Sequence, residues 1–165
     1  MKEIMIDKIT LNIGTGEPGD KLDKAMKLLD KISGAKSIQT KSKRRIPTWN
    51  IRPGLPIGCM VTLRGEKAEK LLHSLFSAVD NNLKRSSFDD FGNFSFGIKE
   101  YLDIPNVGYD VSIGIIGLEV AVTLKRKGFR VKERRLKRGK IGRAHLISKE
   151  DAINFIGSKF KVGVK

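Results

Sequence analysis

The sequence predicts an α+β fold with a mainly antiparallel sheet, helices packed on one face of it, and a polar, basic opposite face. Segments 4–13, 57–64 and 118–125 alternate apolar and polar side chains, the period of half-buried strands. Segments 20–33 and 65–83 repeat apolar residues at helical spacing. The strands do not alternate one for one with helices, as a parallel sheet requires, so antiparallel pairing is expected.

Length and charge narrow the class of protein before any motif is considered. The 165 residues suit one domain, 1–165, and 33 Lys and Arg against 18 Asp and Glu give a net charge of +15. Such a balance indicates a polyanionic partner, with nucleic acid favoured over an anionic membrane surface. A membrane partner is not expected, because the chain has no basic amphipathic helix and no apolar run near twenty residues.

The remaining composition points to a protein without metal or disulfide. The N-terminal segment lacks the apolar core and cleavage site of a signal peptide, so a cytoplasmic location is expected. Cys59 is the single cysteine, which excludes an internal disulfide and a cysteine-based zinc site. His73 lies among apolar positions and His145 in a basic loop, and neither spacing indicates a metal ligand.

The first strand, 4–13, alternates most cleanly from Lys8 onward. Its inward side chains are Ile9, Leu11 and Ile13, and its outward side chains are Lys8, Thr10 and Asn12. The outward set suits an ordinary solvated face. It also suits RNA, because hydroxyl and amide groups hydrogen-bond to phosphate, ribose or base edges while lysine supplies charge.

Gly14–Gly19 matches the G-x-G-x-x-G pattern of dinucleotide-binding turns between a strand and a helix. Glu17 places a carboxylate where a pyrophosphate would lie, and Pro18 removes a backbone N–H that such a loop uses. No acidic residue follows at the distance of the ribose partner. A nicotinamide-dependent enzyme therefore remains only a remote alternative.

Two helices carry the expected core. The first begins with Asp20 as its N-cap and stops at Gly34, and the second runs from Gly65 to about Leu83. The apolar face of the first consists of Leu22, Ala25, Met26, Leu29 and Ile32, and that of the second of Ala68, Leu71, Leu72, Leu75, Phe76, Val79 and Leu83.

Between these helices lies the stretch 39–65, which holds six basic residues and no acid. Its ends predict a short strand over 37–42 and a strand over 57–64 whose inward residues are Cys59, Val61 and Leu63. The connection, 43–57, is rich in proline and glycine, so we expect an extended arm without helix. Fully extended, such an arm reaches roughly 20–25 Å from the sheet. Its basic character and Trp49 suggest contact with a polyanion.

Aromatic and acidic residues gather in 82–110, which predicts loops and short strands. Phe88, Phe91, Phe94, Phe96 and Tyr101 are expected to cap the core, with base stacking as the alternative. Asp89, Asp90, Glu100, Asp103 and Asp110 form the main acidic patch. Acids repel RNA, so this patch suits a basic protein neighbour. No nucleophile or base accompanies the acids at a catalytic spacing, and no enzyme activity is expected.

The last third begins with the strand 118–125, whose inward residues are Leu118, Val120, Val122 and Leu124. The basic insert, 125–145, carries eleven basic residues and one acid within 125–143. Such blocks are disordered or interact, and RNA contact is favoured here. Ser148 and Asp151 resemble a capping box for a helix, and Phe160, Val162 and Val164 suit a final short strand.

Several long motifs resemble one family, the large-subunit ribosomal proteins of the "L five" type that bind 5S rRNA. The resembling segments are DKITLNIGTGE at 7–17, Thr40-Lys41, IRPGLPIGCMVTLRG at 51–65, FDDFGNFSFGIKE at 88–100 and Tyr109-Asp110. The N-terminal helical extension of the bacterial form is missing. The tail, 128–165, is similar to the archaeal and eukaryotic form.

The resemblance implies a ribosomal location, a structural role in translation without cofactor or metal, and a set of contact residues. Residues on the segments that contact 5S rRNA are Lys8, Thr10, Asn12, Gly14, Thr40, Lys41, Lys43, Gly58, Thr62 and Arg64. The arm, with Arg44, Arg45, Trp49 and Arg52, would face peptidyl-site tRNA. Further contact with large-subunit rRNA is expected from Arg130, Arg134, Arg135, Lys137 and Arg138 of the basic insert. A second 5S-binding ribosomal protein would be a neighbour. A basic chaperone or regulator that binds RNA outside a particle remains an alternative.

Overall fold

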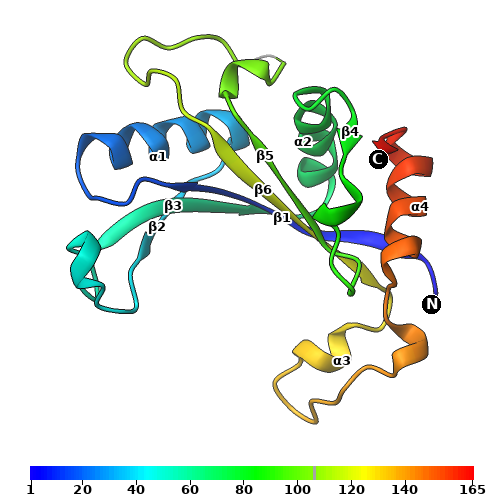
Figure 1. Cartoon of the computed structure of the whole chain (residues 1–165). Helices are drawn as coiled ribbons and strands as arrows, with labels where there is room; N and C mark the ends of the chain where they lie inside the picture. Colours follow the sequence, from blue (N-terminus) through cyan, green and yellow to red (C-terminus); the bar gives the residue numbers. More distant parts are fainter. Residues whose placement is uncertain (106) are drawn as a thin grey trace. The chain divides into compact units, whose positions relative to one another are not determined.

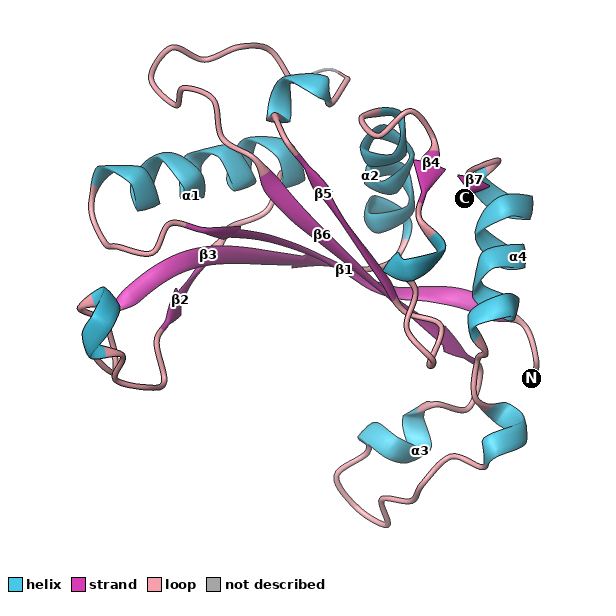
Figure 2. Cartoon of the chain, in the orientation of Figure 1, coloured by secondary structure: helices cyan, strands magenta, loops and turns pink. Residues whose placement is uncertain are grey.

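The computed structural model describes residues 1–105 and 107–165 and has an α+β fold, as predicted. A mainly antiparallel five-stranded sheet has the order β2-β3-β1-β6-β5, and β4 and β7 form a separate parallel pair (Figures 1 and 2). The strands are β1 Ile4–Gly14, β2 Ile38–Lys41, β3 Pro56–Leu63, β4 Asn82–Leu83, β5 Phe94–Ile98, β6 Leu118–Arg126 and β7 Gly163–Val164. The helices are α1 Asp20–Ser33, α2 Glu66–Ser77, α3 Arg130–Glu133 and α4 Lys149–Phe160.

The chain forms two compact units. The arm unit comprises Thr10–Leu63 and Gly97–Val120. The insert unit comprises Met1–Ile9, Arg64–Phe96 and Ala121–Lys165. Strands β1, β5 and β6 contribute residues to both units.

In the arm unit, α1 packs on β3 (Figure 1). The helix buries Leu22, Ala25, Leu28 and Leu29 because these residues recur on one face of the helix. Strands β2 and β3 are antiparallel, with Ile38 opposite Met60 and Thr40 opposite Gly58, and the register shifts after Thr40. The predicted inward residues of β3, Cys59, Val61 and Leu63, are all buried.

In the insert unit, aromatic residues from two helices and β5 form the core. The ring of Phe76 on α2 stacks on Phe94 at 6.2 Å and meets Phe160 of α4 edge-on at 5.3 Å between centroids. The parallel pairing of β4 with β7 aligns Leu83 with Val164. The residues predicted to face inward on β6 are buried in both units, Leu118 and Val120 in the arm unit and Val122 and Leu124 in the insert unit.

The predicted stop of α1 at Gly34 is confirmed, whereas its predicted N-cap and the predicted end of α2 were wrong. Gly19, not Asp20, is the N-cap of α1, and no side chain caps it. α2 ends at Ser77 rather than near Leu83, because Asp80 and Asn81 adopt positive φ values of 54° and 52° that a helix excludes.

The arm also contains a helical turn, which the prediction of a non-helical connection excluded. A 3₁₀ turn spans Pro47–Trp49 and begins with a proline, which a helix tolerates at its first position. Because Ile46 and Ile51 exchange backbone hydrogen bonds of 2.9 and 3.1 Å, the tip of the arm is closed rather than extended.

Candidate nucleic-acid interface

The polar side chains of β1 in the arm unit lie beside those of β3 and β6. The hydroxyl oxygens of Thr10 and Thr62 are 3.5 Å apart. Asn12 donates from Nδ2 to Oε2 of Glu119 over 3.3 Å. Thr10 and Asn12, predicted together on the first strand, are thus brought onto one face with Thr62, which was predicted on another strand. Glu119, which sequence reasoning missed, adds a carboxylate to that face. Lys8 and Arg64 belong to the insert unit, where Lys8 is half-buried and Arg64 is exposed.

Two predicted glycines of the arm unit have different surroundings. A Cβ on Gly58 would lie 2.7 Å from the carbonyl oxygen of Ile13 and 2.9 Å from Oγ1 of Thr40. Gly58 is buried, so its missing side chain makes room for neighbouring protein atoms. Gly14 is exposed and has open space around it. It lines a hollow of about 340 Å³ together with Asn12, Lys99 and Glu119.

The Gly14–Gly19 loop uses its backbone donors within the protein. The N–H groups of Thr15 and Gly16 both donate to the carbonyl of Ile57, each over 3.0 Å. Glu17 forms an exposed ion pair of 2.8 Å with Lys21, whose hydrogen bond lowers the pKa of the Glu17 carboxyl. A pyrophosphate would have to displace the carbonyl of Ile57 from these donors, so the geometry does not favour a dinucleotide site.

The cations of the stretch 39–65 are exposed to solvent. They are Lys41, Lys43, Arg44, Arg45, Arg52 and Arg64. Among the described residues, none of them forms an ion pair with a protein carboxylate. Each therefore keeps its charge available for an external anion.

The tip of the arm combines an anchored backbone with an exposed aromatic ring. Ser42 accepts a bond from Gly54 and donates one to Leu55, over 2.9 and 2.8 Å. Ile51 is buried, whereas 70% of the Trp49 side chain is exposed. The 3₁₀ turn lies beyond the ends of β2 and β3 (Figure 2).

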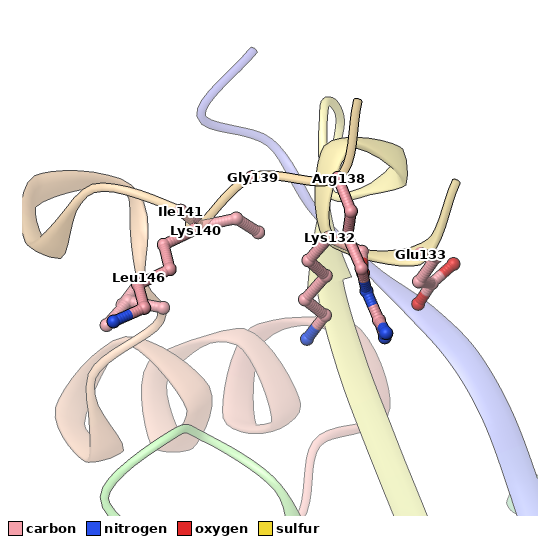
Figure 3. Close-up of a pocket in the computed structure, with 7 residues that line it drawn as sticks. All are labelled: Lys132, Glu133, Arg138, Gly139, Lys140, Ile141 and Leu146. Carbon is pink, nitrogen blue, oxygen red and sulfur yellow. The ribbon is translucent and has the colours of Figure 1, made fainter. Parts of the chain in front are cut away.

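The basic insert is folded, and the five arginines and lysines predicted there are all exposed. They are Arg130, Arg134, Arg135, Lys137 and Arg138. Arg134 donates from Nε to the carbonyl of Lys137 over 2.7 Å, which braces the turn between them. Together with Lys132 and Lys140, which the sequence did not single out, Arg138 lines a pocket of about 620 Å³ (Figure 3).

Arg126, at the start of the insert, is a buried cation that sequence reasoning missed. Its Nη1 donates to the carbonyl of Leu146 over 3.1 Å, and its Nη2 donates to Oδ2 of Asp151 over 2.8 Å. The guanidinium thus joins the beginning of the insert to its end and to the first turn of α4. Its Nε is buried without a partner among the described residues.

The predicted core role of the aromatic cluster is confirmed for most of its members. Phe88, Phe94 and Tyr101 are buried, while 62% of Phe91 is exposed. The predicted acidic patch is divided between the two units. Asp89 holds its own loop by accepting bonds from Phe91 and Asn93. Asp110, in the arm unit, accepts bonds from Ser112, which lower the pKa of its carboxyl.

The histidines make contacts of an ordinary kind. The ring of His73 lies 4.6 Å from that of Phe160, and Nε2 of His145 is 2.9 Å from the carbonyl oxygen of Lys127. No cluster of three potential metal ligands occurs among residues 1–105 and 107–165. In the same residues, no helix has the length and apolar character needed to cross a membrane.

Comparison with known families shows that a chain with this fold and these basic surfaces is a ribosomal type of protein. The model described as "Ribosomal protein L5" matches residues 1–52, and a second model, which describes the C-terminus of the same ribosomal family, matches residues 56–155. The chain therefore belongs to the ribosomal protein L5 family, whose members are structural and not enzymes.

Similar proteins named "Large ribosomal subunit protein uL5" extend over nearly the whole chain. The one from Nanoarchaeum equitans is 53% identical over 165 residues, covering 99% of this chain and 97% of its own. The one from Sulfurisphaera tokodaii is 47% identical, covering 99% and 93%. The one from Methanosphaera stadtmanae is 44% identical, covering 100% and 98%. These relatives are archaeal, which agrees with the predicted similarity of the chain to the archaeal and eukaryotic form, and a ribosomal location follows from the family.

Proposed function

We propose that this chain is a structural constituent of the large ribosomal subunit that binds 5S rRNA as one domain, 1–165. The observation that carries the proposal is the stretch 39–65, whose six cations are exposed and make no ion pair within the described part of the protein. In a chain of net charge +15, such cations neutralise phosphates of an RNA backbone.

The polar sheet face supplies the recognition that charge alone lacks. Thr10, Asn12 and Thr62 lie together in the arm unit and offer hydroxyl and amide groups. Such groups bond to ribose hydroxyls, which distinguish RNA from DNA, and to base edges, which distinguish one RNA sequence from another. The proposed contact set comprises Lys8, Thr10, Asn12, Gly14, Thr40, Lys41, Lys43, Gly58, Thr62 and Arg64. Gly58 is buried, so we assign it an indirect part in this set: its lack of a side chain leaves room for the hydroxyl of Thr40.

We further propose that the arm, 43–57, contacts peptidyl-site tRNA. Its exposed cations are free of carboxylate partners within the described residues, and the exposed ring of Trp49 offers a stacking surface. The basic insert, 125–145, would contact large-subunit rRNA through its exposed arginines and lysines. Exposed acids such as Glu100 and Asp103 would face a basic protein neighbour, a second 5S-binding ribosomal protein.

Binding to 5S rRNA tests the central proposal. The wild-type protein should bind 5S rRNA at near-physiological salt in the presence of an unrelated duplex RNA of equal length. The double variant Lys41→Ala/Arg64→Ala should bind at least about tenfold more weakly, because two phosphate contacts are lost. Lys67→Ala/Lys70→Ala, which removes two exposed cations of α2, is the matched control and should bind like wild type. Equal loss of the wild type to any duplex would refute specific 5S binding.

A variant of the arm separates its role from that of the sheet. Replacing Arg44, Arg45 and Arg52 with alanine leaves Ile46 and Ile51 to close the loop. We expect 5S rRNA binding to change by less than about threefold, while peptidyl-site tRNA binding by reconstituted subunits falls. Loss of 5S binding in this folded variant would contradict the proposed division of roles.

A further inference from the structure

The pocket in the basic insert has the chemistry of a nucleotide site. It lies within the insert unit and has a volume of about 620 Å³. Its lining residues are Lys132, Glu133, Arg138, Gly139, Lys140, Ile141 and Leu146 (Figure 3). Three cations against one acid make it a site for an anion, and the two aliphatic side chains give it an apolar part.

Two of the cations are oriented by the protein rather than left free on the surface. The ammonium group of Lys132 lies over the ring of Phe129, 4.8 Å from the centroid. Arg138 donates from Nε to the carbonyl of Lys132, which leaves its two terminal nitrogens for other acceptors. Figure 3 shows the charged ends of Lys132 and Arg138 pointing in the same direction, whereas the carboxylate of Glu133 is turned aside.

The backbone that carries these cations is fixed at several points. The N–H of Gly139 donates to the carbonyl of Val131 over 3.1 Å, which joins the two sides of the pocket. Arg126 bonds to the carbonyl of Leu146 and so holds the apolar side. The pocket is therefore formed before a ligand enters, and less conformational entropy is lost on binding.

We propose that this pocket binds one unpaired nucleotide of ribosomal RNA. Lys132 and Arg138 take its phosphate, and the aliphatic side chains of Ile141 and Leu146 contact its base. The inference rests on the RNA-binding function proposed above. A paired nucleotide does not fit the same description, because its base is stacked inside a helix and exposes only an edge.

The test compares RNA hairpins that share one stem. One hairpin is fully paired, and four others each carry a single bulged A, C, G or U. The wild-type protein should bind at least one bulged hairpin several-fold more tightly than the paired one. Lys132→Ala/Arg138→Ala should abolish that preference and reduce the slope of log K against log[salt] by about 1, because the two cations share one phosphate. Ile141→Ala should reduce the preference and leave the slope unchanged, because it removes a base contact and no charge.

Control variants and 5S rRNA make the outcomes decisive. Lys67→Ala/Lys70→Ala removes equal charge from α2 and should keep the preference for a bulge. Thermal melts monitored by circular dichroism establish that each variant is folded. Equal wild-type binding to paired and bulged hairpins, or a preference that survives Lys132→Ala/Arg138→Ala, would overturn the pocket assignment. If 5S rRNA is still bound specifically in that case, only the pocket fails. If 5S rRNA is not bound either, the proposed function fails as well.

Discussion

At the scale of single residues, two glycines of the proposed RNA contact set differ in whether the fold requires them. Ile13 and Thr40 approach the Cα of Gly58 so closely that a side chain would collide with backbone and hydroxyl atoms. The residue is therefore required by the arm unit itself. Gly14, at the end of β1, has no such neighbours and lies open to solvent.

The two glycines give a matched pair of alanine variants. Gly58→Ala should lower the free energy of unfolding by about 1–3 kcal/mol, because β1 or Thr40 must shift to admit the methyl group. Gly14→Ala should change it by less than about 0.5 kcal/mol. Urea denaturation of both variants measures the difference. A Gly58→Ala protein as stable as wild type would show that β3 relaxes freely at this position.

Cys59 should be unreactive in the folded protein. Its side chain is fully buried, and burial together with the negative charge of Asp30 raises the pKa of the thiol to about 11, from an ordinary 9.0. At pH 8 only about one thiol in a thousand is then ionised, against about one in ten after unfolding. Alkylation by iodoacetamide at pH 8 should be at least about a hundredfold slower in the native protein than in urea. Comparable rates would mean that β3 opens readily.

Single residues also show that the sequence pattern predicts burial but not the partners of buried groups. The alternation of β1, β3 and β6 identified the buried residues correctly, because the period of a half-buried strand is two. Arg126 falls in that same alternation as a cation at an inward position, yet only the structure reveals Asp151 as its partner. The two are 25 residues apart, and no local pattern connects them.

At the scale of elements, α4 is the best-specified helix. Ser148 accepts from the N–H of Asp151, and the Asp151 carboxylate accepts from the N–H of Ser148, so the predicted capping box is confirmed. Asp151 also accepts from Arg126. One carboxylate therefore stabilises the helix start and holds the cation that closes the insert.

The stability of this helix start should depend on pH in a defined direction. Burial raises the pKa of Asp151, but the bonds from Ser148 and Arg126 outweigh burial and hold that pKa below its ordinary value of 3.8. The stabilisation is complete above pH 3.8 and is lost as the pH falls through the lower pKa of the folded protein. The difference in unfolding free energy between wild type and Asp151→Asn should be constant from about pH 5 to 7 and shrink below that.

Urea titrations at each pH measure this difference. Glu150→Gln serves as the control, because Glu150 lies in the same turn but makes no ion pair within the described residues. If the difference in unfolding free energy does not change between pH 7 and pH 3, the charge of the Asp151 carboxylate does not stabilise the helix start.

Element boundaries were predicted less well than element types. The apolar spacing of 65–83 continues past Ser77, so periodicity extended α2 too far, whereas the positive φ of Asp80 and Asn81 ends it. In the arm, prolines were taken to exclude any helix, but Pro47 starts a single 3₁₀ turn. Both errors arise because a local backbone conformation overrides a pattern of side chains.

At the scale of the whole molecule, charge without a partner is the dominant property. In the described residues, no ion pair includes a cation of the 39–65 stretch or a cation that lines the pocket of the insert. The sequence predicted this surplus from composition, but not which cations remain free. That distinction depends on contacts such as Lys125 with Asp7, 118 residues apart along the chain.

The surplus charge predicts a strong dependence of RNA affinity on salt. If about six phosphates are neutralised, log K for 5S rRNA should fall against log[salt] with a slope of about −4 to −5. Lys41→Ala/Arg64→Ala should reduce that slope by about 2, since each lost phosphate contact removes about one counterion. Filter binding over a salt series measures both values. A slope near zero for the wild type would mean that affinity does not come from these cations.

The exposed ring of Trp49 has a consequence for spectroscopy. It is the chain's single tryptophan, and it lies at the tip of the arm rather than in either core. Its fluorescence therefore reports the surroundings of the arm with little contribution from the folding of the rest. We expect an unfolding transition followed by circular dichroism to leave this emission almost unchanged, and a base stacked on the ring to quench it. Trp49 is thus an intrinsic fluorescent probe within the segment proposed to contact tRNA.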